Sequence, residues 1–230
     1  MICATLWKKN YQSLADITVA NKMRYAEEHG YLTHFVQIDD YADLMYVKLD
    51  VILQALDKIA VDDWCWFSDC DGVVTNMDRR LEDLVALAEG AVIIVANDFK
   101  GINSGSMMVK NCQRVRDYFK FILSQKHLFN CEQVAMERTC ETGQWCGIVK
   151  LVDQHLLNSY DYNLIRTMGP LTDKIFRLGQ WQPGDFFIHF PATVYAKRLE
   201  LCRQYDALCK RPEVIQSPSL GNPHQELVIQ

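Results

Sequence analysis

Two carboxylates one residue apart, Asp69 and Asp71, are the side chains whose type and spacing most clearly suggest chemistry. They follow the aromatic run 64–68 and precede Gly72, so a buried strand is expected to end in a turn that presents both acids. Two hard oxygen donors this close together suit a divalent cation such as Mg²⁺ or Mn²⁺, which usually brings a phosphate with it. The pair therefore predicts metal-bound phosphate chemistry; the alternative is a turn whose acids are only solvated.

An alternation of strands and helices must position these acids. Apolar runs predict strands at residues 2–6, 32–38, 64–68 and 91–96. Helical spacing predicts helices at 14–29, at 46–59, and from a cap at Asp78 to a stop at Gly90. This order predicts an α/β fold with a largely parallel sheet and right-handed crossovers. Both acids then lie at the carboxyl edge of the sheet, where open α/β sheets bind ligands.

The second half of the chain is less regular, as expected where long loops carry function. It predicts helices at 109–123, 154–160 and 193–209, and a strand at 186–190. Three prolines and little periodicity follow residue 211. We therefore expect one domain over residues 1–211 and a flexible tail or linker stub over 212–230.

Composition narrows the class of protein. The 230 residues are 49% hydrophobic, which is enough for one substantial core, and the net charge of −5 argues against a partner such as duplex nucleic acid. Nine cysteines lack the spacing of a zinc site or a disulfide framework and are expected to be reduced. Neither a signal peptide nor an apolar run of membrane-spanning length is evident, which predicts a cytoplasmic protein without a membrane span.

The segment from Asp69 to Thr75 resembles the first motif of haloacid-dehalogenase-type phosphatases. That resemblance implies Asp69 as nucleophile and Asp71 as general acid. Those enzymes place the motif on their first strand and add a late acidic pair, whereas here a βαβα unit precedes it and Asp185 has no second acid after it. The phosphatase is therefore kept as the alternative reading.

A second resemblance covers more of the chain. Its motifs occur, in order, at residues 20–31, 48–49, 64–76, 97–98, 103–111, 153–158 and 187–191. Together they resemble GT-A-fold glycosyltransferases of family 34, the galactosyl- and xylosyltransferases, and the later motifs also resemble family 8. The fold implied is a GT-A, Rossmann-like, three-layer sandwich with a mainly parallel central sheet.

This resemblance assigns expected roles to individual residues. The implied metal ligands for Mn²⁺ or Mg²⁺ are Asp69, Asp71 and His189. Donor contacts are implied for Thr5, Leu6, Asp69, Asp98, Asn103, Ser104, Gly105 and Lys197. Asp153 and Gln154 would lie beside the anomeric carbon as catalytic residues, and Glu132-Gln133 is a reserve acidic pair near the acceptor.

One departure from family 34 concerns the cation for the donor diphosphate. A lysine is expected about five positions after His189, and Val194 stands there instead. Lys197 and Arg198 follow as candidates, because cationic side chains bind phosphate oxygens.

The function implied is transfer of a hexose-type or related sugar from a UDP-sugar donor to the hydroxyl of a carbohydrate or glycan acceptor, with retention of anomeric configuration. A module that binds a nucleotide sugar without catalysis is a third possibility. The lack of an anchor would fit a bacterial enzyme, or a viral one acting in the host cytoplasm.

Overall fold

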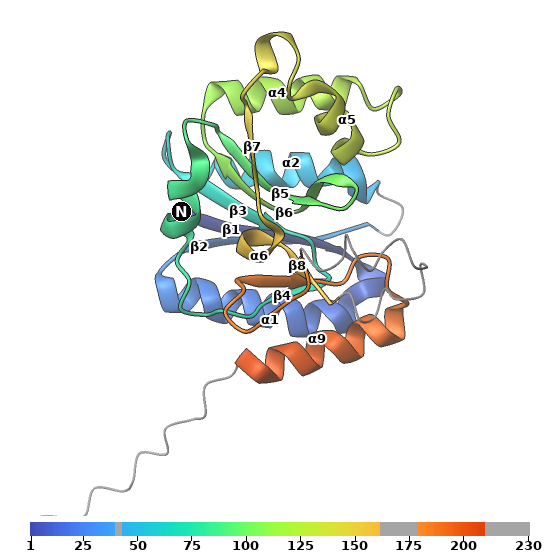
Figure 1. The fold of residues 1–230 in the computed structure, drawn as a ribbon. Helices are drawn as coiled ribbons and strands as arrows, with labels where there is room; N and C mark the ends of the chain where they lie inside the picture. The colour runs from blue at the N-terminus through green and yellow to red at the C-terminus, as the bar shows by residue number, and fades with distance from the viewer. Residues whose placement is uncertain (40–42, 162–178, 210–230) are drawn as a thin grey trace, which may run out of the picture.

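The computed structural model describes residues 1–39, 43–161 and 179–209. Its main sheet has six strands in the order β2-β1-β3-β6-β5-β7 (Figure 1). In chain order they are β1 (Ile2–Lys8), β2 (Leu32–Ile38), β3 (Trp64–Ser68), β5 (Ile93–Asp98), β6 (Gly101–Lys110) and β7 (Val149–Val152). A smaller sheet of three strands lies beside it and consists of β4 (Gly72–Val74), β9 (Phe187–His189) and β8 (Ser159–Tyr160).

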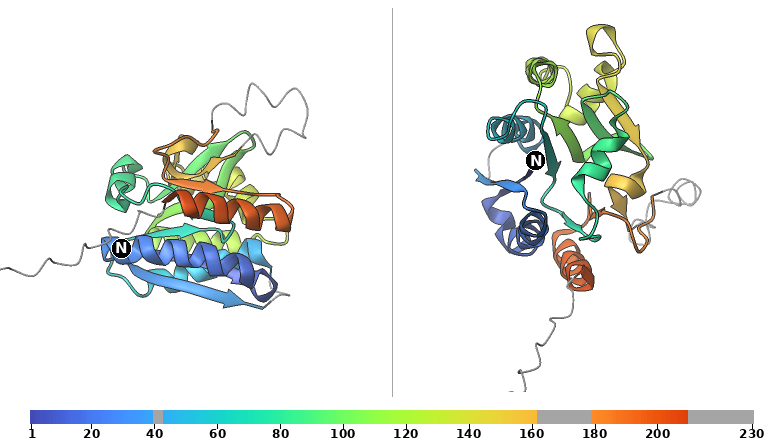
Figure 2. Two further views of the ribbon diagram at one scale, coloured as in Figure 1. Left: turned by 90° about the horizontal axis from the view of Figure 1, so that it is seen from below. Right: turned by 90° about the vertical axis from the view of Figure 1, so that its left-hand side faces the viewer.

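Helices cover both faces of the main sheet. One side carries α2 (Leu44–Leu56), α4 (Gln113–Ser124) and α5 (Glu132–Thr139); the other carries α1 (Gln12–His29), and α9 (Tyr195–Cys209) packs beyond it against α1 and the small sheet (Figures 1 and 2). Shorter helical segments are η1 (Lys9–Tyr11), α3 (Leu81–Val85), η2 (Ala86–Ala88), η3 (Gly143–Trp145) and α6 (Gln154–Leu157). The expected α/β three-layer architecture is confirmed. No helix in the described ranges is long and apolar enough to cross a membrane.

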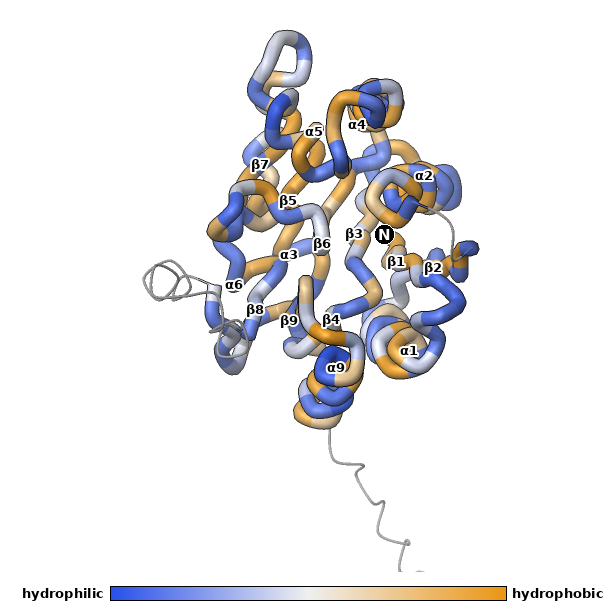
Figure 3. Tube along the Cα trace, turned by 90° about the vertical axis from the view of Figure 1, so that its right-hand side faces the viewer, coloured by the Kyte–Doolittle hydropathy of each residue, from blue (hydrophilic) through white to orange (hydrophobic). Residues whose placement is uncertain are grey.

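Side chains that alternate along each strand build two cores. On β3, Cys65 and Phe67 pack on the α2 side, whereas Trp64 and Trp66 face the opposite core together with Tyr25 of α1. This two-residue period is the one that a strand buried on both faces requires. A third cluster seals the small sheet against α1 and α9 (Figure 3). All nine cysteines are free in the structure.

One strand of the main sheet runs against the others. β6 is antiparallel to both of its neighbours, while the other pairs of this sheet are parallel. The cause is a tight hairpin between β5 and β6, in which Asp98 pairs with Gly101, because strands joined by two residues can only be antiparallel. Gly101 has a φ of +114°, which a side chain would disfavour.

Several predicted boundaries were wrong; the helix predicted at 46–59, for example, is α2 and ends at Leu56. The first helix turn of α3 begins after Arg80 rather than at an Asp78 cap, because the Asp83 carboxylate accepts the Arg80 backbone N–H. Residues 109 and 110 belong to β6, so the helix predicted from 109 begins only at Gln113. The helix predicted over 154–160 ends at Leu157, and β8 follows. The predicted tail, 212–230, lies outside the described residues.

Candidate active site

The two acids lie in the short loop that leaves the main sheet. β3 ends at Ser68, and Asp69, Cys70 and Asp71 connect it to β4. The backbone N–H of Asp69 donates to the Gly105 carbonyl at 2.8 Å. The fully buried Lys22 of α1 donates from Nζ to the Gly72 carbonyl at 2.7 Å. The loop is therefore held at both ends by contacts from other elements.

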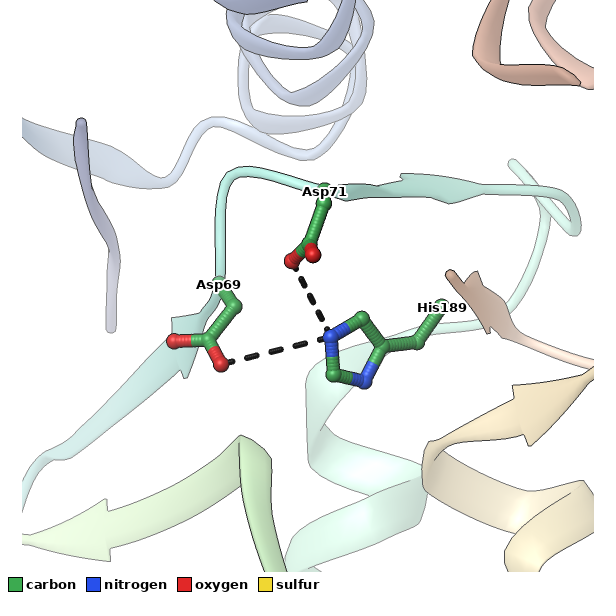
Figure 4. Close-up of side chains that lie close together, drawn as sticks. All are labelled: Asp69, Asp71 and His189. Carbon is green, nitrogen blue, oxygen red and sulfur yellow. Dashed lines mark hydrogen bonds and ion pairs between the residues drawn. The ribbon is translucent and has the colours of Figure 1, made fainter. Parts of the chain in front are cut away.

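His189 reaches the acids because β9 pairs with β4. Their antiparallel register sets Gly72 opposite His189. The imidazole Nε2 lies 3.0 Å from Asp71 Oδ1 and 4.0 Å from Asp69 Oδ2 (Figure 4). His189 is buried, and its Nδ1 has no hydrogen-bond partner within the described part of the chain. One strand pairing thus brings His189 to Asp71, 118 positions away in the sequence.

Gly105 leaves the space that this imidazole occupies. A Cβ at position 105 would overlap the ring, lying 2.7 Å from His189 Nδ1 and 2.9 Å from the Asn103 side-chain oxygen. Contacts this short require a neighbour to move. The role expected for Gly105 was a contact with the donor; the structure adds close approach to His189.

The three side chains fit a divalent cation. One ligand atom from each of Asp69, Asp71 and His189 lies within 4.8 Å of the others. Carboxylate oxygens with a single imidazole nitrogen suit Mn²⁺, and Mg²⁺ less well because it prefers oxygen alone. Burial raises the pKa of Asp71, but the stronger influence of His189 and Arg198 lowers it to about 2. Asp71 is therefore ionised at neutral pH, as a carboxylate that holds a metal must be.

A cavity of about 430 Å³ opens beside Asp69, Asp71 and His189, and Lys48 forms part of its wall. Lys48 Nζ lies 2.9 Å from Glu132 Oε1 and 3.1 Å from Asp69 Oδ1. Burial lowers the pKa of Lys48, but the charges of Asp69 and Glu132 outweigh burial and raise it. The Ser104 hydroxyl donates to Glu132 Oε1 at 2.6 Å, and Gln133 Oε1 accepts the Ser104 backbone N–H at 3.1 Å. Lys48 belongs to the motif at residues 48–49, but no role was predicted for its side chain from the sequence.

The structure brings most of the predicted residues to this cavity. Its lining includes Leu6, Asp69, Asp71, Asn103, Ser104, Gly105 and His189, and also Glu132, Gln133 and Arg198. Thr5 does not line it, because Thr5 is buried and its hydroxyl donates to the Ser68 carbonyl at 2.7 Å. Lys197 does not line it either; it is 45% exposed and pairs with Glu200 at 2.7 Å.

Asp98, Asp153 and Gln154 lie elsewhere, around a second hollow of about 410 Å³. Asn103 connects the two sites. Its amide nitrogen donates to Asp98 Oδ2 at 2.9 Å and to the Tyr160 hydroxyl, while its oxygen accepts from Asn158 at 2.6 Å. The structure therefore does not bring the Asp153-Gln154 pair to the cavity beside Asp69, Asp71 and His189, which we call the metal-side cavity. The acidic-amide pair found there is Glu132-Gln133.

Comparison with known proteins gives a consistent result. The sequence profile of the galactosyl transferase GMA12/MNN10 family matches residues 3–90 and 84–200. The chain is 23% identical over 229 residues to an alpha-1,2-galactosyltransferase of Schizosaccharomyces pombe, and the match covers 80% of this chain. The same match spans 57% of that relative, little more than half its length.

Solved structures with similar folds are also glycosyltransferases. A glycosyltransferase involved in glycosylation of the major capsid of PBCV-1 matches with a TM-score of 0.70 and 16% identity, over 88% of this chain and 98% of that one. The galactosyltransferase LgtC, in complex with donor and acceptor sugar analogues, matches with a TM-score of 0.51 and 13% identity, over 93% and 98%. At these identities the likeness shows the GT-A fold.

Proposed function

Because the chain belongs to the galactosyl transferase GMA12/MNN10 family, we propose that it transfers a hexose-type sugar from a UDP-sugar to a carbohydrate hydroxyl with the help of Mn²⁺. The observation that carries the proposal is the cluster of Asp69, Asp71 and His189 at the wall of a cavity of about 430 Å³. That volume is within the range of small-ligand sites, roughly 300–1,000 Å³.

The proposed chemistry follows from the leaving group. When the glycosidic bond of a nucleotide sugar breaks, negative charge accumulates on the diphosphate, and a bound divalent cation stabilises that charge. Asp71 and His189 would hold the cation, with Asp69 as a third ligand. Leu6 and Tyr11 line the same cavity and provide apolar surface for a nucleoside.

For the sugar end of the donor we propose Ser104, Glu132 and Gln133. Glu132 is 1% exposed, and its Oε2 has no hydrogen-bond partner in the described chain. This oxygen can therefore accept a hydrogen bond from a sugar hydroxyl. A carboxylate on this face would also stabilise oxocarbenium-like charge on the departing sugar. Retention of configuration is part of the proposal and rests on the resemblance. Asp153 and Gln154, which the resemblance implies beside the anomeric carbon, line a separate hollow, and we propose them for the acceptor side instead.

Calorimetry of UDP binding with and without Mn²⁺ tests this function. Wild-type protein should bind UDP far more tightly with Mn²⁺ than without it. Asp71→Asn should remove the metal-dependent part, because one oxygen ligand and its charge are lost. Asp50→Asn, exposed on α2, is the matched control and should match wild type. Equal UDP affinity with and without Mn²⁺ in the wild-type protein would rule out the proposal.

Activity assays then separate the alternatives. A panel of UDP-sugars with glycan acceptors should give transfer, or slow donor hydrolysis, only with metal. A binding module would bind UDP and turn over no donor. A phosphatase would hydrolyse phosphate monoesters and lose that activity in Asp69→Asn. The fold and family do not favour it, because the acids follow the third strand of the chain rather than the first.

A further inference from the structure

Arg198 of α9 reaches the metal-side cavity from the chain's last described helix. It lines the cavity, and 13% of its side chain is exposed. One guanidinium nitrogen lies 3.2 Å from Asp71 Oδ2, and another donates to the Thr193 carbonyl at 2.9 Å. The guanidinium carbon lies 6.0 Å from the centre of the Tyr11 ring. The side chain is thus fixed beside the acid that is proposed to hold the metal.

The guanidinium retains donors for a further anion. Arginine has five N–H donors, and the buried Nε of Arg198 has no hydrogen-bond partner among residues the structure describes. A planar, permanently charged group with several parallel donors matches phosphate oxygens better than an ammonium does. An oxyanion bound next to Asp71 would therefore find both charge and unused donors on Arg198.

The neighbouring cations are placed differently. Of the cations that line the cavity, Lys8, Lys48 and Arg198, only Arg198 pairs with Asp71 in the described ranges. Lys48 is already shared between Asp69 and Glu132. Position 194, where the family resemblance expects a lysine, carries a valine that is 77% exposed.

We propose that Arg198 binds the diphosphate of the nucleotide donor and supplies the cation that the loop after His189 lacks. This inference rests on the proposed function, because it requires a nucleoside diphosphate at the metal side of the cavity. It assigns to α9 a contact that the sequence motif would assign to a loop lysine.

A series of ligands with zero, one and two phosphates tests whether Arg198 binds the diphosphate. Uridine, UMP and UDP are titrated by calorimetry in the presence of Mn²⁺ against wild type, Arg198→Met and Arg198→Lys. Wild type should gain affinity from UMP to UDP. Arg198→Met should lose about ten- to a hundredfold in UDP affinity, with uridine affinity unchanged, because hydrogen bonds to charged groups have about this effect. Arg198→Lys should fall between them, since it keeps the charge and loses the paired donors.

Two variants on the same helix are controls. Arg203→Met removes an exposed arginine and should bind UDP as wild type does. Lys197→Met separates the two adjacent candidates: wild-type UDP affinity supports Arg198, and a loss in Lys197→Met with none in Arg198→Met overturns the proposal. Thermal unfolding of each variant establishes that the folded protein is being titrated.

A titration with Mn²⁺ alone distinguishes diphosphate binding from mere placement of Asp71. If Arg198 binds the diphosphate, Arg198→Met should bind Mn²⁺ at least as tightly as wild type, because Asp71 loses a competing cation. If Mn²⁺ and UDP affinities fall by the same factor, Arg198 acts only through Asp71 and the proposal is overturned. Wild-type protein without metal-dependent UDP binding would instead refute the proposed function itself, which is a separate result.

Discussion

Lys48 offers the sharpest test of how the cavity wall is stabilised. Its ammonium is shared between Glu132 at 2.9 Å and Asp69 at 3.1 Å. Removing one member of a buried ion pair costs about 3–5 kcal/mol, because the remaining charge stays buried. The Asp69 side chain is 29% exposed and water screens it, so its share is small. For Lys48→Met we expect a loss of about 3 kcal/mol in the free energy of unfolding, mainly from stranding Glu132.

A double-mutant cycle isolates that cause. Glu132→Gln keeps the shape and an acceptor for Ser104, and Lys48 keeps Asp69 as a charged partner at 3.1 Å, so this change should cost only about 1 kcal/mol alone. In Lys48→Met/Glu132→Gln no stranded carboxylate remains, and the total loss should be about 2 kcal/mol rather than the sum of the single losses. The measurement is urea denaturation at neutral pH without metal, where Lys48 is charged because its pKa is raised above 10.5.

The control is an exposed pair. Lys150 and Glu89 lie 2.5 Å apart with exposures of 32% and 72%, so Lys150→Met should cost under about 1 kcal/mol. Additive losses in the Lys48–Glu132 cycle would refute the reasoning, since they would mean that neither charge depends on the other.

Three further predictions concern the site and its scaffold. Gly105→Ala should weaken Mn²⁺ binding about tenfold or more in calorimetry, because the new Cβ displaces His189; unchanged affinity would show that the imidazole does not hold the metal. Asn21→Leu should lower the unfolding free energy by about 2–4 kcal/mol in urea, because Asn21 pairs with both backbone groups of Val74 inside the core; a loss below about 1 kcal/mol would contradict this. Tyr31 donates to Glu82 at 2.6 Å, and burial together with that bond raises the pKa of Tyr31 to about 12. The contribution of the protonated Tyr31 to the free energy of unfolding is therefore complete below pH 10 and is lost as the pH rises through about 12. In urea denaturation across that range, Tyr31→Phe should not show this loss.

The longer strands with an apolar pattern were predictable from the sequence, whereas β6, which is built partly from polar and small residues, and the short strands β4, β7 and β8 were not. The predicted bounds of 32–38 and 64–68 match β2 and β3. β6 was missed because it carries Gly101, Asn103, Ser104 and Gly105, which normally disfavour strands. Their polarity is accommodated by partners from distant segments, such as Tyr160 and Glu132, which no local pattern reveals.

Some residues of the candidate site could be predicted from local motifs, and others could not. Asp69 and Asp71 could be found because a local motif carries them, and His189 because its motif follows in family order. The resemblance favoured the acidic-amide pair at 153–154 and kept 132–133 in reserve, but locally the two pairs are alike, since each stands at the start of a helix. Packing of α5 against β6 brings Gln133 to Ser104, and this tertiary contact has no signature in spacing.

The pairing of β4 with β9 has a consequence for the order in which the protein becomes competent. A growing chain holds both acids once residue 71 has been synthesised, yet their histidine partner arrives only with β9, close to the last described helix. Everything between them must be synthesised before the three side chains can meet. Binding of the proposed donor would then require that synthesis has passed β9. A chain arrested before β9 would carry Asp69 and Asp71 but would lack His189.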